Sequence, residues 1–180
     1  MKQFHLIDIA YSDLLPITYT RPVSAIRIGI SRIDEKWTQM TNSTFSYVTA
    51  THLSEKYQAK YTNDNVYINS GLLPTKELIQ LIDQLPTGQM LIQNDLIIAF
   101  RCTDQLKIDH SIPELQKVQT DLSIHCIQFP WHIFQFNHVA IQQDIEQSDC
   151  SANPEIDSSN TLIGPGDDLY VDPSVEMYGV

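Results

Sequence analysis

The chain has 180 residues, of which 42% are hydrophobic and 18% are charged. This balance is typical of a globular domain with a hydrophobic core and excludes wholesale disorder. The sequence holds 11 Lys and Arg residues against 22 Asp and Glu residues, which gives a formal net charge of −11. Non-specific binding to nucleic acids or anionic membranes is therefore excluded, because both need a basic surface.

The cellular compartment is inferred from apolar runs and cysteines. No stretch has the roughly 18 consecutive apolar residues of a membrane-spanning helix, and the N-terminal segment lacks the apolar core of a secretory signal peptide. Cys102, Cys126 and Cys150 are scattered, without C-x-x-C spacing. They predict neither a disulfide framework nor a zinc site. We therefore expect a soluble cytoplasmic protein with reduced thiols.

Strands are predicted where short apolar runs, rich in β-branched or aromatic residues, end at turn-forming residues. Single strands are expected at residues 4–10, 46–50, 66–70 and 121–129. The two apolar arms of residues 90–101 flank Asn94-Asp95. That dipeptide favours a tight turn, so this segment predicts a β-hairpin.

Helices are predicted between these strands. An apolar stripe with helical spacing indicates a first helix over residues 24–40, and residues 52–61 favour a short second one. Thr75 is expected to cap a third helix that ends before Gly88. A fourth is expected at residues 131–147. The alternation of strands and helices predicts an α/β domain with a mostly parallel sheet.

The C-terminal residues change character. Ile163, Leu169 and Val175 recur at intervals of six residues, and an aliphatic residue at this period is typical of a left-handed parallel β-helix. Three blocks are the minimum that such a repeat needs, although three matches of one residue also arise by chance. We expect residues 1–155 to form the α/β domain and residues 156–180 the beginning of an incomplete β-helix.

The arginines are the most informative charged residues. Three of the four, Arg21, Arg27 and Arg32, lie within twelve residues of one another. Clustered guanidinium groups in an acidic protein are suited to binding phosphate or carboxylate. The alternative is a solvated helix face on which Arg32 pairs with an acidic neighbour, and the residues alone leave both interpretations open.

The remaining polar residues indicate no specific chemistry. Asp8 ends the first predicted strand, where α/β sheets place ligand-binding groups, but a turn-capping role is equally consistent. The histidines show no metal-ligand spacing. No nucleophile elbow, phosphate-binding P-loop or zinc-protease motif is present. The metal-binding residues, if any, stay unknown.

Three stretches taken together resemble a known family: residues 14–37, 66–75 and 129–137. The most specific part is the pattern T-R-P-V-x-x-x-R-x-G-I, which runs from Thr20 to Ile30. The chain resembles the sugar nucleotidyltransferases of the GlmU-like type, best known in Bacteroidetes. In these proteins a nucleotidyltransferase-like domain precedes a left-handed β-helix.

This resemblance implies a nucleotide-diphospho-sugar transferase fold, which is a Rossmann-like mixed sheet with flanking helices. It implies the reaction of a nucleoside triphosphate with a sugar 1-phosphate, with Mg²⁺ at the phosphates. Arg21 and Arg27 are then expected to act in catalysis by binding phosphate. The expected substrate-binding residues are Thr18, Thr20, Asn69 and Asn137. The ligand would be a nucleotide or nucleotide-sugar, and the whole protein a homotrimer assembled through its β-helix.

The chain departs from the wider superfamily at the phosphate-binding loop. Ile9 and Tyr11 stand at its two glycine positions, Asp13 at its arginine and Val23 at its lysine. Side chains at the glycine positions keep backbone N–H groups away from a triphosphate. We expect the arginine cluster to supply the positive charge that is missing.

The metal site departs as well. Gly71 stands where the superfamily has an aspartate that binds Mg²⁺, and Asn137 corresponds to the second metal position. These differences favour an alternative interpretation, in which the domain is a catalytically degenerate binding or regulatory module attached to a β-helix acyltransferase. A third interpretation is a sugar-binding module that takes no nucleotide.

Overall fold

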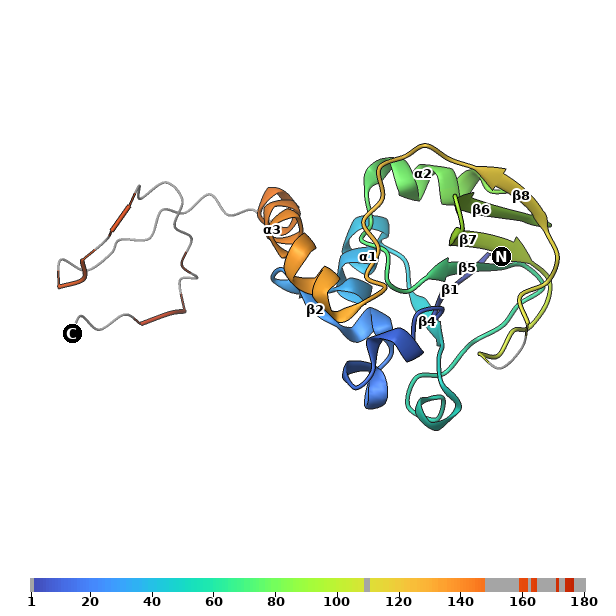
Figure 1. Cartoon of the computed structure of the whole chain (residues 1–180), viewed down its shortest axis with the longest axis horizontal. Coiled ribbons are helices and arrows are strands. Elements are labelled where there is room, and N and C mark those ends of the chain that lie inside the picture. The colour runs from blue at the N-terminus through green and yellow to red at the C-terminus, as the bar shows by residue number, and fades with distance from the viewer. Residues whose placement is uncertain are drawn as a thin grey trace. The chain divides into compact units, whose positions relative to one another are not determined.

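The computed structural model describes residues 2–108, 111–147, 159–161, 163–164, 171 and 174–176. The chain divides into two compact units, Met1–Asp144 and Ile145–Val180. The β-helix expected at residues 156–180 falls largely outside the described residues and stays a prediction. The first unit contains the secondary structure that positions the candidate site (Figure 1).

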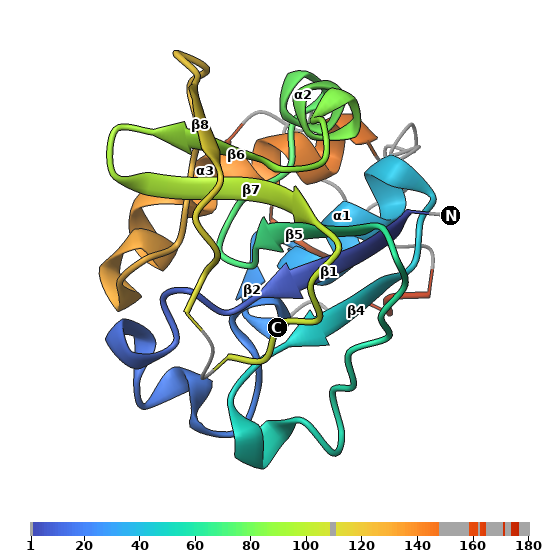
Figure 2. The same ribbon diagram turned by 90° about the vertical axis from the view of Figure 1, so that its right-hand side faces the viewer.

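A mixed six-stranded sheet forms the centre of the first unit (Figure 2). In spatial order its strands are β4 (Phe45–Val48), β1 (Gln3–Ile7), β5 (Asn65–Asn69), β7 (Leu96–Cys102), β6 (Gln89–Gln93) and β8 (Gln116–Gln119). β1 pairs in parallel with both β4 and β5, and β6 pairs in parallel with β8. β7 runs antiparallel to β5 and β6. The predicted α/β class and the predicted β6–β7 hairpin are confirmed.

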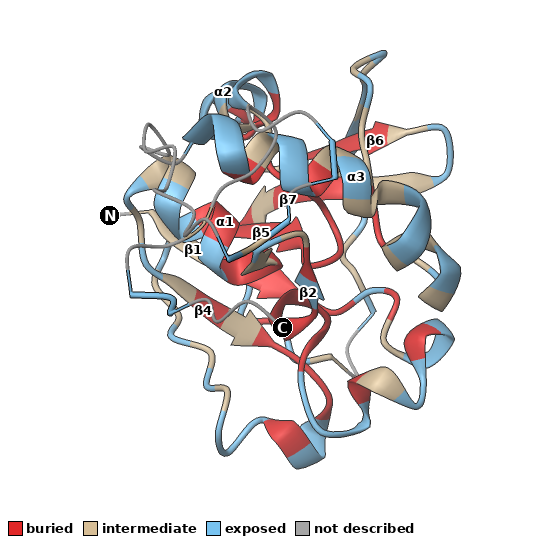
Figure 3. Ribbon diagram, turned by 90° about the vertical axis from the view of Figure 1, so that its left-hand side faces the viewer, coloured by how far each residue is buried: buried red, intermediate tan, exposed pale blue. Residues whose placement is uncertain are grey.

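The central strands of the sheet are buried on both faces, as the fully buried β5 shows. Successive side chains of a strand point to opposite sides, so one strand contributes to two buried clusters. In β5, Val66 and Ile68 join one buried cluster, whereas Tyr67 joins the other. Leu6 and Ile7 of β1 divide in the same way. Figure 3 shows the buried strands behind helices whose outer surfaces are exposed.

Three helices, α1 (Ile33–Thr41), α2 (Lys76–Gln84) and α3 (Pro130–Gln147), lie on one face of the sheet (Figures 1 and 2). The predicted cap of α2 is confirmed, because the Thr75 side chain accepts a hydrogen bond from the Leu78 N–H. α3 matches its predicted range within one residue. Over the described part of the chain, no helix has the length and apolar character needed to cross a membrane.

The helix predicted at residues 24–40 is wrong over its first half, because α-helical structure begins only with α1. The preceding residues form a 3₁₀ turn and a two-stranded hairpin: η3 (Val23–Ala25), β2 (Arg27–Ile28) and β3 (Ser31–Arg32). The hairpin turns at Gly29, whose φ of +69° favours glycine. α1 then starts where the Glu35 side chain accepts a hydrogen bond from the Arg32 N–H.

The helix predicted at residues 52–61 is also wrong. One 3₁₀ turn, η4 (Thr51–Leu53), stands at its start. The chain then follows the edge strand β4, where the Tyr47 N–H donates to the Gln58 carbonyl. Covering an edge strand protects its backbone from unwanted pairing. Two further 3₁₀ turns, η1 (Ser12–Leu14) and η2 (Ile17–Tyr19), follow β1.

The strand predicted at residues 121–129 is not part of the sheet. Cys126 forms an isolated bridge with Leu72, and the adjacent Ile127 N–H donates to the Gly71 carbonyl at 2.7 Å. The sheet is extended instead by β8, whose largely polar sequence gives no strand signal. These backbone contacts hold the segment before α3 against the loop that follows β5.

Candidate functional site

The carboxyl ends of β4, β1 and β5 meet at one edge of the sheet, because the three strands are parallel. Asp8 directly follows β1 and is 1% exposed. It accepts hydrogen bonds from the Val23 N–H (3.1 Å), the Ser70 hydroxyl (2.7 Å) and the Thr49 hydroxyl (2.5 Å). Thr49 follows β4 and Ser70 follows β5. One carboxylate therefore ties three strand ends to the turn η3.

Burial dominates the ionisation of Asp8. It raises the pKa of the carboxyl from 3.8 to about 6, against the opposing effect of the three hydrogen bonds. Because protein donors engage both carboxylate oxygens, Asp8 acts as an anchor of the surrounding loops. This geometry favours the turn-capping interpretation of Asp8 over a ligand-binding one.

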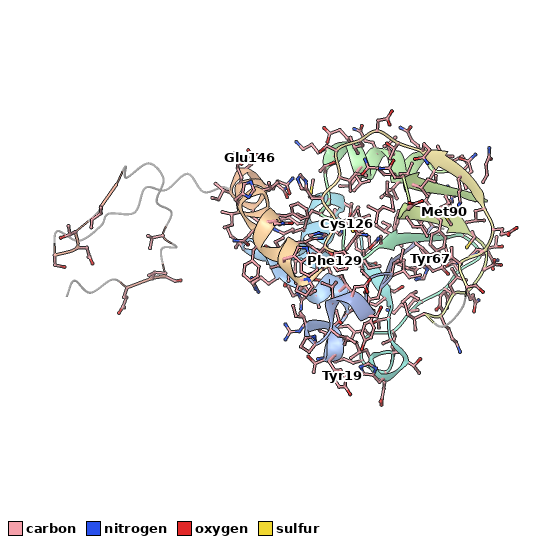
Figure 4. All side chains as sticks on the ribbon, in the orientation of Figure 1. Tyr19, Tyr67, Met90, Cys126, Phe129 and Glu146 are labelled. Atoms are coloured by element: carbon pink, nitrogen blue, oxygen red, sulfur yellow. The ribbon has the colours of Figure 1, made fainter. Side chains whose placement is uncertain are left out.

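A pocket of about 490 Å³, here called the strand-end pocket, lies beside this anchor. Ile9 and Ala10, which follow β1, and Asn69, the last residue of β5, form part of it. The β6–β7 turn and the segment that leads into α3 supply the other walls. Figure 4 labels Cys126 of the lining and Phe129, which directly precedes α3. Open α/β sheets commonly bind ligands in a crevice at this edge.

Two polar side chains of the strand-end pocket are held by the protein itself. The Asn69 amide donates to the Ile97 carbonyl (3.0 Å) and accepts from the Gly71 N–H (3.1 Å). The Gln93 amide donates to the Leu122 carbonyl at 2.5 Å. Asn69 and Gln93 therefore stabilise the pocket wall, because their amides already bind protein partners.

Four other polar side chains line the strand-end pocket and keep hydrogen-bonding atoms with no partner in the described part of the protein. They are the amides of Asn94 and Gln128, the carboxylate of Asp95 and Nε2 of His132. The other nitrogen of His132, Nδ1, orients the ring, because it lies 3.1 Å from both the Gln128 backbone nitrogen and the Cys126 carbonyl oxygen. Among the described residues of the lining, Asp95 supplies the only carboxylate, and none is Lys or Arg.

A run of aromatic rings leads from the surface to the strand-end pocket. Phe129 and Trp131 stack with ring centroids 4.7 Å apart, and Trp131 is 54% exposed. The His132 ring lies 6.2 Å from Trp131 and 5.4 Å from Phe136, which lines the pocket. Such rings offer flat, apolar surfaces to a ligand.

The predicted phosphate-binding arginines are exposed and do not line the strand-end pocket. Arg21 lies two residues before Val23, whose N–H is bound by the Asp8 anchor. Arg27 lies in β2, and its guanidinium donates to the Ile30 carbonyl. Arg32 pairs with carboxylates in the first turn of α1, as the structural alternative for that residue predicts.

Of the other predicted site residues, Asn69 lines the strand-end pocket and three lie elsewhere. Thr18 is buried, and its hydroxyl donates to the Tyr11 carbonyl at 2.7 Å. Thr20 is exposed beside Arg21. The geometry thus assigns Thr18 a contact within the loop that follows β1.

Asn137 docks the β2–β3 hairpin on α3. Its Oδ1 accepts a hydrogen bond from the Gly29 N–H (2.9 Å), and Asp144 of the same helix accepts one from the Ile30 N–H (2.7 Å). Asp144 also pairs with the buried ammonium of Lys36. A Cβ on Gly29 would lie 2.6 Å from the Asp144 carboxylate. Packing against α3 therefore accounts for the glycine of the T-R-P-V pattern.

The residues at the expected Mg²⁺ position do not fit a metal. A Cβ on Gly71 would lie 2.4 Å from the Ile127 carbonyl oxygen, so an aspartate has no room there unless the backbone moves. The Asp8 carboxylate is engaged by protein donors, which leaves Asp95 alone in the strand-end pocket. Within the described ranges, no three His, Cys, Asp or Glu side chains are grouped to hold a metal. Proteins usually hold Mg²⁺ by one or two carboxylates together with waters and substrate phosphates, and position 71 supplies no such carboxylate.

A family described as sugar nucleotidyl transferase matches residues 7–150 of the sequence. The chain belongs to the sugar nucleotidyl transferase family. The matched range contains every residue of the strand-end pocket, so the pocket is part of the sugar nucleotidyl transferase domain. The resemblance to a nucleotidyltransferase is confirmed, while the GlmU-like affiliation stays a prediction. None of the curated proteins matches the chain.

Sequence reasoning misses most of the pocket in this sugar nucleotidyl transferase. It predicts Asn94 and Asp95 only as a turn, and it assigns no role to Gln128 or His132. The position of the Asn94-Asp95 turn is a signal that could have been used. Because β7 pairs antiparallel with β5, the turn before β7 lies near the carboxyl end of β5. The 129–137 stretch that carries the resemblance also contains His132.

Proposed function

We propose that this domain joins a nucleoside triphosphate to a sugar 1-phosphate, with formation of a nucleotide-sugar and release of pyrophosphate. The observation that carries the proposal is the strand-end pocket, which lies inside the matched family domain at the carboxyl ends of β1 and β5. Parallel strand ends are the general ligand-binding edge of open α/β sheets. The free amides, imidazole and carboxylate of the pocket suit a substrate rich in hydroxyl groups.

In this proposal the arginines bind phosphate from positions outside the lining of the strand-end pocket. Arg21 does so from the loop that Asp8 anchors, and Thr20 lies beside it as an exposed hydroxyl donor. Arg27 does so from the β2–β3 hairpin. Both guanidinium groups are exposed, so a ligand can reach them without displacing buried structure. Thr18, Asn69 and Asn137 hold the surrounding backbone through the hydrogen bonds that they make.

A second candidate function is ligand binding without turnover. The contact between position 71 and the Ile127 carbonyl favours it, because this contact leaves no space for a metal-binding aspartate. A domain of this kind would keep the nucleotide-sugar site of the family and report the ligand to another part of the protein.

The test is a pyrophosphate-release assay. The chain is mixed with each nucleoside triphosphate and a set of hexose 1-phosphates in the presence of Mg²⁺, and released pyrophosphate is followed through a coupled phosphatase. We expect release with at least one pair, and a rate at least about tenfold lower for Arg21→Ala, because a charge-assisted contact to phosphate is lost. Lys2→Ala is the matched control, since Lys2 precedes β1 at the opposite edge of the sheet.

Two results decide between the candidates. Release that depends on Arg21 but not on Lys2 supports the transferase. A folded chain that binds a nucleotide-sugar, yet releases no pyrophosphate with any pair, overturns the transferase and supports the binding module.

A further inference from the structure

The outer side of α3 presents a large aromatic side chain to solvent. Among the large hydrophobic residues that the structure describes in the first unit, Phe134 is the most exposed, at 82%. Ile141 lies two turns further along the same face of the helix and is exposed as well. No Asp, Glu, Lys or Arg stands between Trp131 and Gln143. This face of α3 is therefore uncharged, and an exposed apolar group on such a face marks an interaction surface.

A second pocket, here called the α1–α2 pocket, is formed by helices α1 and α2 together with strands β1, β4 and β5 (Figure 1). Its volume is about 290 Å³. The apolar residues of its lining are Phe4, Trp37, Met40, Phe45, Ile68, Ile79 and Ile82. The Phe45 ring lies 5.9 Å from that of Phe4 and 6.1 Å from that of Trp37, measured between centroids. Since an apolar cavity of about 150 Å³ already holds benzene, the α1–α2 pocket has room for one aromatic side chain.

The polar side chains of the α1–α2 pocket already bind protein partners. The Thr41 hydroxyl donates to the Trp37 carbonyl (2.7 Å), and the Ser43 hydroxyl donates to the Thr41 carbonyl (3.2 Å). Asp83, the only charged residue of the described lining, accepts a hydrogen bond from the Lys2 ammonium at 2.8 Å. The pocket therefore offers an occupant apolar and aromatic surface, which suits an uncharged ring.

We propose that Phe134 of one copy of this chain inserts into the α1–α2 pocket of a second copy. The protruding ring and the ring-lined pocket complement each other in size and chemistry, and both belong to the same chain. The contact joins two different surfaces, so it is heterologous and links copies head to tail, into a closed ring or an open chain.

The charges of the two surfaces favour this occupant. Two copies of a chain with a net charge of −11 repel each other, so they associate best where neither surface carries net charge. The outer face of α3 is uncharged, and the Asp83 carboxylate of the α1–α2 pocket is paired with Lys2. The inference is independent of the proposed function, because neither Phe134 nor any residue of the α1–α2 pocket lines the strand-end pocket.

The test is sedimentation velocity of the full chain over a wide range of protein concentration. We expect the weight-average mass to rise with concentration. Phe134→Ser should raise the dissociation constant of self-association by about tenfold or more, because burial of the phenyl ring is lost. Gln135→Ser is the matched control, since Gln135 is the exposed neighbour of Phe134. A wild type that stays monomeric at every concentration would overturn the inference, and so would unchanged association of Phe134→Ser.

A mixing experiment distinguishes the head-to-tail contact from a two-fold pairing of α3 with α3. Ile79→Trp fills the α1–α2 pocket and leaves Phe134 in place, whereas Phe134→Ser leaves the pocket open. Each variant alone should be monomeric, and an equimolar mixture should form a dimer and nothing larger, because one intact contact remains. Ile79→Trp that associates as the wild type does would overturn the inference and indicate the two-fold pairing.

A second pocket variant guards against misfolding of Ile79→Trp. Ser43→Phe fills the α1–α2 pocket from another side and should behave in the same way, alone and in the mixture. Circular dichroism verifies that each variant is folded before it is mixed. A mixture of folded variants that stays monomeric would overturn the inference.

Discussion

Gly71 packs against the carbonyl oxygen of Ile127 so closely that a Cβ on residue 71 would lie 2.4 Å from that oxygen. The hydrogen bond from the Ile127 N–H to the Gly71 carbonyl, 2.7 Å long, holds the two segments together. The position at which the resemblance places a metal-binding aspartate is thus occupied by a backbone-to-backbone contact. The same contact fixes the segment that carries Cys126 and Gln128 into the strand-end pocket.

Replacement of Gly71 by alanine is expected to destabilise the fold. The added methyl group must displace the Ile127 carbonyl, and overpacking of this kind costs about 1–3 kcal/mol of the free energy of unfolding. Urea denaturation of the wild type and of Gly71→Ala measures the difference. An unchanged midpoint would show that the two segments separate freely.

The buried ion pair between Lys36 and Asp144 is expected to respond asymmetrically to mutation. Asp144→Ala leaves the Lys36 ammonium buried without its partner and frees the Ile30 N–H, and breaking such a pair costs about 3–5 kcal/mol. Lys36→Met leaves the Asp144 carboxylate with the hydrogen bonds from Ile30 and Ser31, and should cost less. Denaturation curves of the two variants compare these costs. Equal losses, or a larger loss for Lys36→Met, would contradict the assignment.

Asp8 and His5 are expected to make opposite contributions to the pH dependence of stability. Between pH 3.8 and about 6, folded Asp8 holds a proton that the unfolded chain has released, so the free energy of unfolding falls as pH rises, by about 3 kcal/mol. Burial lowers the pKa of His5 from 6.5 to about 4, against a hydrogen bond to Asn65 that raises it. Between pH 4 and 6.5 the unfolded chain holds a proton on His5 that the folded chain has released. The free energy of unfolding therefore rises with pH over this range, by about 3 kcal/mol.

The variant Asp8→Asn separates the two contributions. In the wild type they offset each other between pH 4 and 6.5, whereas the variant keeps only the contribution of His5. We expect its stability to increase with pH across this range by about 3 kcal/mol more than that of the wild type. Urea denaturation at several pH values measures both curves. Parallel curves would show that Asp8 is not perturbed by burial.

The arginines and the strand-end pocket are expected to act on different parts of one ligand. Arg21→Ala should weaken binding of a hexose 1-phosphate by about tenfold, because a charge-assisted hydrogen bond to phosphate is lost. The same variant should bind the corresponding methyl hexoside as the wild type does. Calorimetry with the two ligands checks the prediction. A loss of affinity for both would place Arg21 in contact with the sugar or show that it supports the fold.

The predictable parts of the fold are those with a local physical signal. Thr75 caps α2 with its own hydroxyl, and Asn94 takes a φ of +53° in the tight turn that its sequence favours. The polar strand β8 offers no such signal, because its place in the sheet depends on backbone pairing with β6. Gly29 likewise breaks an apolar spacing that suits a helix, since its turn is stabilised by contacts with the distant Asn137.

The candidate site is less predictable than the fold. Asn69, Asp95 and His132 reach one pocket from three segments, and only the sheet topology brings them together. Arg21 and Arg27 can be selected from the sequence by their charge. The sequence does not indicate their positions relative to the pocket, and in the structure both are exposed and outside its lining.

The most direct test of the account is acrylamide quenching of tryptophan fluorescence during titration with a hexose 1-phosphate. Of the two tryptophans, Trp37 is 1% exposed and Trp131 is 54% exposed, so quenching reports on Trp131. Its ring lies 6.2 Å from that of His132 in the pocket wall. A ligand in the strand-end pocket should shield Trp131 and lower the quenching constant towards that of Trp131→Phe. A ligand that binds by calorimetry but leaves the quenching constant unchanged would contradict the account, in which the run of rings from Trp131 to His132 borders the bound ligand.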